Sequence, residues 1–346
     1  MLKVFDVRVY MIKTPLFWWK SQGLCSLFLY PISLIYGSIS SIRMKYGRRW
    51  NAPIPIICVG GFVMGGTGKT PTALALASAV IDKNLKPGFL SRGYGRKSTL
   101  SLRVDLEKHG AYDVGDEPLL LAQRATVVVT NDRKMGVKIL LQERVDIIIM
   151  DDGFHSADLR ADFSLIVVDS HRGLGNGLVF PAGPLRVPLS RQLLYVDAIL
   201  YVGDTKNIIP SIKNKLIYFS KLEPRLKFDF SKTRVLAFSG IADTKKFFTT
   251  IQKLGAIIEK HYSFGDHAHL SDKKIECILD QAQQDNLVLV TTEKDAMRLY
   301  KRSGIAEKLL SISIVIGVDM IFQDPTNLSD IVDKTILSFD NRNSCI

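Results

Sequence analysis

The sequence predicts an α/β protein with a P-loop NTPase-like parallel sheet domain, a second, smaller α/β domain and an N-terminal membrane-associated helix. An apolar run rich in β-branched residues, 54–59, leads into the glycine-rich stretch GGTGKT at 65–70 and then into a helical pattern. Further short apolar runs, each ending in polar or glycine-rich residues, are typical of strands buried in a parallel sheet. We place the domain boundaries at residues 1–50, 51–228 and 229–346.

Length and composition agree with a folded chain of two domains. The 346 residues are enough for two domains, and 47% hydrophobic with 23% charged residues exclude an intrinsically disordered protein. The four cysteines are widely scattered and form no CxxC pair: Cys25, Cys58, Cys277 and Cys345. This usage disfavours a disulfide framework or a zinc site and indicates a reduced, cytosolic compartment.

The N-terminal arm combines positive charge with an apolar stretch. Residues 1–50 carry eight Lys or Arg residues against one acid, in a chain whose net charge is +12. Residues 21–42 contain no charged residue, and their number is close to the ~20 residues that a membrane span needs. Basic charge beside apolar sequence favours a membrane surface with anionic lipids, so we expect no nucleic-acid partner.

The pattern within the uncharged stretch favours a monotopic anchor that lies in the membrane interface. Small residues fall on one helical face: Ser26, Ser33, Gly37 and Ser40. Apolar residues take the other face: Leu24, Phe28, Ile35, Ile39 and Ile42. Pro31 and the small polar residues argue against a span. Two alternatives stay open, a helix packed on the protein's own body and a true membrane span.

The glycine-rich stretch has the residues and the strand–loop–helix context of a phosphate-binding loop. Its backbone N–H groups and the start of the following helix would cradle the phosphates, with Lys69 reaching the β/γ oxygens and the Thr70 hydroxyl ligating Mg²⁺. The predicted nucleotide-binding residues are Gly65, Gly66, Thr67, Gly68, Lys69 and Thr70. The strict P-loop pattern has glycine where this chain has Val63.

A second predicted strand, residues 145–150, ends in the sequence DDGF. Carboxylates at the C-terminal end of a parallel strand lie beside the P-loop, where ligands bind in open α/β sheets. We therefore expect Asp151 or Asp152 to hold Mg²⁺ or its water shell. The alternative is an acidic turn that only ends the strand.

Three further segments offer polar groups to the same edge of the sheet. The loop SRGYGRK at 91–97 presents Arg92 for an anionic substrate, or is a solvated basic loop. Asp116 and Glu117 begin a predicted helix, where capping explains one acid and a general base would explain the other. A long loop rich in Gly and Pro, residues 173–188, carries two polar groups, Asn176 and Arg186.

The second half of the chain is predicted to form a smaller α/β unit. The pattern predicts strands at 234–240 and 287–292 and helices at 245–254, 272–284 and 293–299. A metal site at Asp266, His267 and His269 is disfavoured because no further ligand is suitably spaced, and we expect His267 to face the cleft. TTEKD, at 291–295, has the wrong spacing for a guanine-binding motif.

Together these segments resemble the tetraacyldisaccharide 4′-kinases, the lipid A 4′-kinases of Gram-negative bacteria. The resemblance follows an ordered series of motifs over most of the chain: GGTGKTP, SRGYGR, VGDEP, DDGF, GNG with FPAGPLR, FGDH and TEKDAMR. It implies transfer of the ATP γ-phosphate to the 4′-hydroxyl of a lipid-linked glucosamine disaccharide 1-phosphate, with ATP and Mg²⁺ as cofactors. It also implies a lid-like second domain and a peripheral or monotopic enzyme at the cytoplasmic face of the bacterial inner membrane.

The resemblance assigns roles to matching positions. It implies that Asp116 is the catalytic base, that His267 assists it, and that Lys69 acts on the phosphates. Thr70, Asp151 and Asp152 match the metal positions. We expect the substrate to be bound by Arg92, Tyr94, Glu117, Asn176 and Arg186. A monomer with a lipid substrate is the expected working form.

Three segments depart from the family's pattern. The family commonly has GN where this chain has Gly60-Gly61, QH where it has His155-Ser156, and a second His where it has Ala268. None of these departures removes a proposed catalytic residue, so we expect activity. The alternative function is a membrane-docked P-loop ATPase switch that acts through partner binding; a soluble small-molecule kinase is disfavoured by the N-terminal arm.

Overall fold

The computed structural model describes residues 15–204, 209, 212, 214–225, 228–266 and 268–344. His267, which is predicted to assist catalysis, lies outside the described residues. Cys345 and the first three basic residues of the arm also lie outside them.

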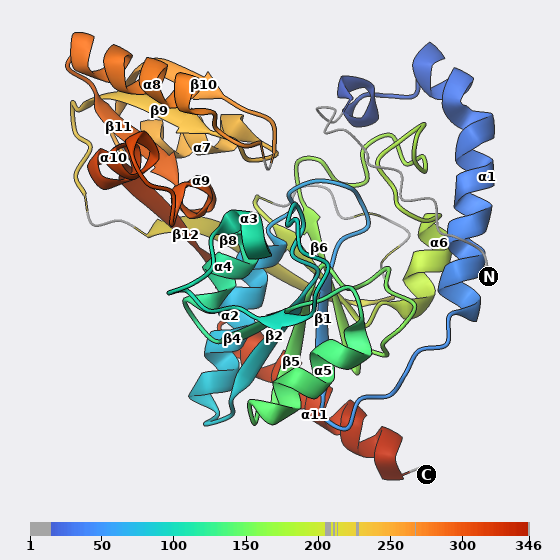
Figure 1. Cartoon of the computed structure of the whole chain (residues 1–346). Coiled ribbons are helices and arrows are strands. Elements are labelled where there is room, and N and C mark those ends of the chain that lie inside the picture. The colour runs from blue at the N-terminus through green and yellow to red at the C-terminus, as the bar shows by residue number, and fades with distance from the viewer. Residues whose placement is uncertain are drawn as a thin grey trace.

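Across the described residues, twelve strands form one sheet in the order β10-β9-β11-β12-β8-β7-β6-β1-β5-β2-β4-β3 (Figure 1). The strands are β1 Ile56–Gly60, β2 Pro87–Ser91, β3 Leu102–Arg103, β4 Thr126–Val129, β5 Ile147–Asp151, β6 Phe163–Asp169, β7 Ala198–Val202, β8 Leu216–Arg225, β9 Arg234–Ser239, β10 Ile257–Ser263, β11 Val288–Thr292 and β12 Ile314–Phe322. Neighbouring strands run parallel except in the pairs β3–β4 and β8–β12. The predicted α/β class with a parallel sheet is confirmed.

Helices cover both faces of the sheet in the P-loop half and cluster around the strands of the other half (Figure 1). The α-helices are α1 Leu24–Tyr46, α2 Lys69–Asp82, α3 Ala111–Val114, α4 Asp116–Ala122, α5 Arg133–Gln142, α6 Leu189–Gln192, α7 Thr244–Lys253, α8 Asp272–Gln284, α9 Glu293–Leu299, α10 Ile305–Ile312 and α11 Thr326–Ser344. Two short 3₁₀ helices are η1 Leu16–Trp19 and η2 Leu193–Tyr195.

Strand β1 shows why the P-loop half needs two helical layers. Its five residues are all buried, and successive side chains point to opposite faces of the sheet. Ile57 and Val59 pack into the core that contains α2, α4 and α11, whereas Ile56 and Cys58 pack into the core that contains α5 and the end of α1. A strand that is apolar on both sides belongs in the middle of a parallel sheet, and β1 lies between β5 and β6.

The chain forms two parts that share the sheet. We call residues 50–225 with α11 the P-loop body, and residues 228–322 the second unit. Strands β8 and β12 join them as a long antiparallel pair, and α11 then returns to pack against α2, β1 and β6 (Figure 1). The second unit has apolar cores of its own, built around β9 and β11. The boundary predicted between residues 228 and 229 stays a prediction.

Helix α1 lies along the P-loop body and presents the two faces that its sequence predicts. Ser26, Ser33 and Gly37 are buried, and the Ser33 hydroxyl donates a 2.6 Å hydrogen bond to the carbonyl of Val179. Its apolar side is exposed, including Leu24, Phe28, Ile35, Ile39 and Ile42. The helix is long and apolar enough to cross a membrane, and only 17% of the residues in its most apolar stretch are buried. The face assignment is confirmed for these residues, and Ser40 of the predicted small-residue face is half-buried.

Candidate active site

The C-terminal ends of β1, β5 and β6 meet at one edge of the P-loop body, the place where open parallel sheets bind ligands. The P-loop leaves β1 after Gly60, and α2 begins at Lys69. Gly68 caps α2 with φ of 96°, a left-handed conformation that favours glycine. Ala242 of the second unit lies close to this loop at Gly66. Any side chain at position 66 would be crowded, since its Cβ would lie 3.2 Å from Cβ of Ala242.

Lys69, Asp152 and Arg186 form a charged cluster beside the P-loop. Lys69 Nζ lies 3.9 Å from Oδ1 of Asp152, and Arg186 donates to Oδ2 of Asp152 at 2.9 Å. Burial by itself would raise the pKa of Asp152, but Arg186 and Lys69 outweigh it and hold that pKa well below the usual range of a carboxyl. Asp152 is therefore ionised and lies beside two cations, one of which is the predicted P-loop lysine.

Asp151 lies in a different environment from its neighbour. It is 3% exposed, and the Thr70 hydroxyl donates to its Oδ2 at 3.4 Å. Burial raises the pKa of Asp151 to about 7, and the negative charge of Glu117 adds to the effect. Its Oδ1, like Oγ1 of Thr67, is buried and makes no hydrogen bond with any residue that the structure describes.

This donor set fits Mg²⁺. Magnesium in nucleotide sites is held by one or two protein oxygens, while phosphates and waters complete its shell. The Thr70 hydroxyl and the Asp151 carboxylate adjoin one another, and Asp151 keeps a buried oxygen that lacks a hydrogen-bond partner within the described part of the chain. The described residues include no group of three or more His, Cys, Asp or Glu side chains that could bind a metal by themselves, without phosphates or waters.

Asp116 and Glu117 begin α4 and face the second unit. Asp116 is 4% exposed, and its Oδ1 accepts a 2.9 Å hydrogen bond from the backbone N–H of Glu117. Two cations of α9 meet this pair: Arg298 Nε donates to Oδ2 of Asp116 at 2.7 Å, and Lys294 Nζ lies 2.7 Å from Oε1 of Glu117. The environment of the predicted base is therefore assembled from both parts of the chain.

The two acidic pairs lie close enough for their charges to interact. The charge of Glu117 raises the pKa of Asp151, while Lys69 and Lys294 lower it, so the P-loop lysine and the α9 lysine act on the same carboxyl. Burial lowers the pKa of Lys294, but Glu117 and Asp116 raise it more, and the net shift is upward. The structure thus brings together residues of the predicted phosphate loop, the predicted metal pair and the predicted acceptor side.

Three predicted substrate-binding residues are positioned differently from this cluster. Arg92 and Tyr94 lie exposed in the loop that follows β2. Asn176 lies in the long loop against α1, where its amide donates to Ser26 Oγ at 3.1 Å and to the carbonyl of Ala182 at 2.8 Å. Its side-chain oxygen accepts from the N–H of residue 178. These bonds hold the loop and α1 together; substrate binding by the three residues stays a prediction.

Sequence reasoning assigned no role to three cations at the site. Lys294 and Arg298 lie four residues apart on α9 and point to one face, a spacing that could have been read from EKDAMR once its place after a strand was known. Arg133, at the start of α5, is 2% exposed, and its terminal nitrogens make no hydrogen bond with any described residue. Burial, and then the charge of Arg92, lowers the pKa of Arg133 to about 10.

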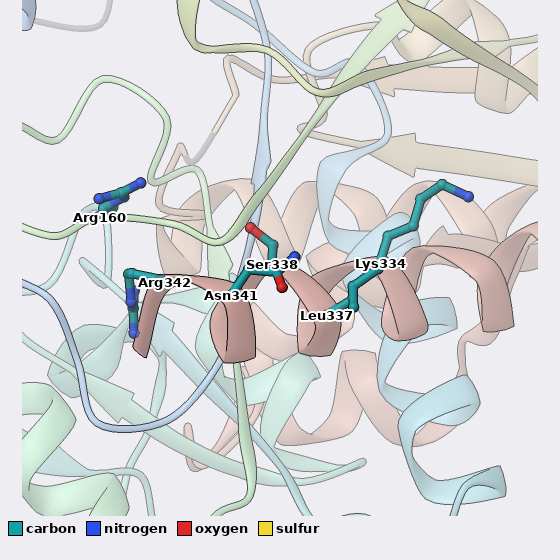
Figure 2. Close-up of a pocket in the computed structure, with 6 residues that line it drawn as sticks. All are labelled: Arg160, Lys334, Leu337, Ser338, Asn341 and Arg342. Atoms are coloured by element: carbon teal, nitrogen blue, oxygen red, sulfur yellow. The ribbon is translucent and has the colours of Figure 1, made fainter. Parts of the chain in front are cut away.

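A cavity of about 420 Å³ lies elsewhere, along α11 (Figure 2). The side chains around it are Arg160, Lys334, Leu337, Ser338, Asn341 and Arg342. None of the residues predicted for the nucleotide, the metal or the substrate is among them. Two of its three cations are also engaged, since Lys334 pairs with Asp330 and Arg342 with Asp162.

Comparison with known proteins finds similar proteins over most of the chain. Residues 25–337 match the model of the family described as tetraacyldisaccharide-1-P 4′-kinase. The tetraacyldisaccharide 4′-kinase of Agrobacterium fabrum is 44% identical over 331 residues, which cover 94% of this chain and 95% of the relative. That of Rhizobium rhizogenes is 46% identical over 329 residues, covering 94% and 93%.

A solved structure has a similar fold along most of the chain. The "apo" form of LpxK from Aquifex aeolicus in complex with ATP superposes with a TM-score of 0.69 at 25% sequence identity. The match covers 90% of this chain and 100% of the Aquifex chain. The relatives and the solved structure thus extend over both the P-loop body and the second unit.

Proposed function

The chain belongs to the tetraacyldisaccharide-1-P 4′-kinase family, and we propose how its residues divide the work of that reaction. The protein is an ATP-dependent kinase of lipid A biosynthesis, which transfers the γ-phosphate of ATP to the 4′-hydroxyl of a tetraacylated disaccharide 1-phosphate. One observation carries the residue assignments. Lys69 lies 3.9 Å from Asp152, and Glu117, which pairs with Lys294 at 2.7 Å, is near enough for its charge to raise the pKa of the adjacent Asp151. We therefore infer that the phosphate loop and the acidic start of α4 serve one site.

On the nucleotide side, the loop amides at 65–70 and the N-terminus of α2 bind the phosphates, and Lys69 neutralises the charge on the transferred group. Thr70 and Asp151 would ligate Mg²⁺, with Asp152 reached through its water shell. Bound Mg²⁺ supplies charge neutralisation at the β/γ phosphate oxygens. Arg186 holds Asp152 ionised and oriented at the edge of this site.

On the acceptor side, Asp116 accepts the proton of the sugar hydroxyl as the hydroxyl oxygen attacks the γ-phosphorus. A carboxylate in hydrogen-bond reach is suited to this task. Glu117 and Lys294 keep the α4 start docked on the second unit. Arg92, with the buried charge of Arg133 behind it, attracts the anionic part of the substrate, and Tyr94 lies in the same loop. We keep His267 as an assisting group on the resemblance of FGDH alone.

The exposed face of α1 is the proposed membrane contact. Its row of exposed apolar side chains would enter the interface, flanked by Trp19 and the basic residues at 43–49. Because the substrate carries acyl chains and ATP is a cytosolic nucleotide, we place the protein as a monotopic protein on the cytoplasmic face of the inner membrane. One chain supplies both sides of the site, so we propose a monomer.

The membrane proposal is tested by flotation with vesicles. The double variant Ile35→Glu, Ile39→Glu should lose most binding to vesicles that contain anionic phospholipid. Leu337→Glu, an equally exposed apolar residue on α11, should bind as the unaltered protein does. Equal binding by all three proteins would contradict the assignment of this face.

The phosphoryl-transfer reaction and its need for Mg²⁺ are tested with purified protein, ATP, Mg²⁺ and the disaccharide monophosphate dispersed in detergent. We expect release of ADP that depends on the lipid and matches the amount of phosphorylated lipid formed. A nucleotide switch would instead hydrolyse ATP at the same rate without the lipid. Omitting Mg²⁺ should abolish transfer; full transfer in a chelator would contradict the metal assignment.

A further inference from the structure

We propose that Arg298 is a positioning residue for phosphoryl transfer, which holds the Asp116 carboxylate ionised and in a fixed orientation from across the junction of the two parts of the chain. This inference rests on the proposed function of Asp116 as the base. Arg298 belongs to α9 of the second unit, whereas Asp116 belongs to α4 of the P-loop body. The residues are 182 positions apart in the sequence.

The guanidinium of Arg298 is bound on more than one edge. Its Nε donates to Oδ2 of Asp116 at 2.7 Å, and its Nη1 donates at 2.7 Å both to the carbonyl of Gly240 and to Oδ1 of Asp295. The side chain is 7% exposed, and Nη2 lies 3.6 Å from Oδ1 of Asp266. A planar fork held in this way fixes direction as well as charge, which a lysine ammonium does not.

Asp295 is the anchor behind Arg298. It is 1% exposed and accepts hydrogen bonds from the Ser239 hydroxyl at 2.9 Å, from the N–H of Gly240 at 2.9 Å and from the Thr292 hydroxyl at 2.7 Å. These donors come from the ends of β9 and β11. Arg298 is thus fixed to the sheet of the second unit, and Asp116 is fixed by Arg298.

Burial makes this contact necessary. A carboxylate that is 4% exposed has lost most of its hydration, and its ionised form then needs a cation close by. Among the described residues, the charged groups near Asp116 include Glu117 on its own helix, Lys294, Asp295 and Arg298 on α9, and Asp266 in the loop before α8. Lys294 makes its short contact with Glu117, so among the described cations Arg298 is the one that donates to Asp116.

The test compares Arg298→Gln, Arg298→Lys and the control Arg302→Gln. Arg302 donates to the carbonyl of Leu270 and pairs with Asp272 within the second unit, away from Asp116. In Arg298→Gln we expect kcat to fall about 100-fold, with little change in KM for ATP, since misplacing a catalytic group costs that much. The acidic limb of its pH–rate profile should move up by about one pH unit because a neighbouring cation is gone.

Arg298→Lys keeps the charge but not the fork, so kcat should recover about tenfold relative to Arg298→Gln. Arg302→Gln should keep the rate and the pH profile of the unaltered enzyme. A purely structural role of Arg298 predicts lower thermal stability with unchanged kcat and pH profile in the fraction that stays folded. That result, or an unchanged pH limb in both Arg298 variants, would overturn the inference.

A double-mutant cycle separates this inference from the function on which it rests. If Arg298 acts through Asp116, then adding Arg298→Gln to Asp116→Asn should lower kcat no further. The same fold loss in both backgrounds would overturn the role of Arg298. Full turnover by Asp116→Asn alone would show instead that the proposed base is wrong.

Discussion

Two adjacent pairs of acids lie at the site, and their surroundings differ. Asp151 ends β5, Asp152 follows it, and the pair contacts cations of the P-loop body, with Arg186 only 34 residues away from Asp152 in the sequence. Asp116 and Glu117 begin α4 and meet Arg298 and Lys294 of the second unit. The direct contacts of the first pair come from the P-loop body, and Lys294 of the second unit acts on Asp151 only through its charge. The second pair is held by direct contacts with the second unit.

The difference supports the proposed division between phosphate binding and acceptor activation. A site for a triphosphate can be preformed at the end of a sheet, because strands fix the ends of the loops that leave them. The acceptor side is held by ion pairs between the two parts of the chain. Arg172 with Asp243 and Lys246 with Asp169 add two more such pairs next to β6. Variants of each acidic pair should therefore have separable effects.

The largest effect is expected from removing the cation of the first pair. Lys69→Ala should lower kcat about 1000-fold, because a charge aimed at the transferred phosphate is lost. The matched control is Lys83→Ala at the other end of α2, where the lysine pairs with Asp333 on the surface. Steady-state rates with a nucleotide titration check both variants. A near-normal rate and near-normal ATP binding in Lys69→Ala would contradict the proposed role of the P-loop in binding the phosphates.

The next effect concerns the second pair. Asp116→Ala should lower turnover about 100-fold or more while ATP affinity changes little, because the base is lost but the phosphate cradle is kept. Asp113→Ala is the control: this nearby acid accepts a hydrogen bond from the N–H of Gly110 at the start of α3. A rate close to that of the unaltered enzyme in Asp116→Ala would show that another group takes the proton.

Breaking the link between the pairs should give a smaller effect. Lys294→Gln leaves the charge of Glu117 without its ion pair, and that charge raises the pKa of Asp151. Asp151 would then be ionised less at neutral pH, so the Mg²⁺ concentration for half-maximal rate should rise about tenfold. Lys260→Gln, which loses only a pair with Asp285, should leave this concentration unchanged. An unaltered Mg²⁺ dependence in Lys294→Gln would show that the pairs are independent.

The smallest effect on rate is expected at His155, where the family commonly has glutamine. Burial, together with the charge of Arg186, lowers the pKa of His155 to about 4, below the ~6.5 of the unfolded chain. The unfolded state therefore binds the extra proton between these values, and stability is lost as the pH falls from about 6.5 to 4. His155→Gln should make this loss shallower while kcat stays within about twofold. Thermal unfolding at several pH values measures it.

The control for that measurement is His261→Gln, because His261 is exposed on β10. It should leave the pH dependence of unfolding as it is. If His155→Gln and His261→Gln give the same curve as the unaltered protein, the buried imidazole does not contribute to the acid sensitivity of the fold.

The sequence predicted the strand, the loop and the helix start at the proposed nucleotide side for a physical reason. A strand, a glycine-rich turn and a helix start are local features, so residues 54–70 could be placed before any tertiary contact was known. The predicted strand at 145–150 corresponds to β5, shifted by one or two residues at its ends. Both faces of α1 also followed from residue spacing, because a helix repeats every 3.6 residues.

The acceptor side could not be predicted in the same way. The contact of Asp116 with Arg298 depends on how α4 packs against α9, and no local pattern encodes a pairing over 182 positions. The return of α11 to the P-loop body is likewise a tertiary event. Asn176 is a further example, because its place in a glycine-rich loop predicted substrate binding, which stays a prediction. The three hydrogen bonds of its side chain within the chain could not be predicted from the loop.

The separation of the two acidic pairs is tested most directly by titrating ATP, with and without Mg²⁺, into Asp116→Asn and Asp151→Asn by calorimetry. We predict that Asp116→Asn binds ATP with the affinity and the Mg²⁺ dependence of the unaltered protein, although it transfers almost no phosphate. Asp151→Asn should lose the Mg²⁺ dependence. Equal weakening of ATP binding in the two variants would contradict the account, because both pairs would then serve the nucleotide.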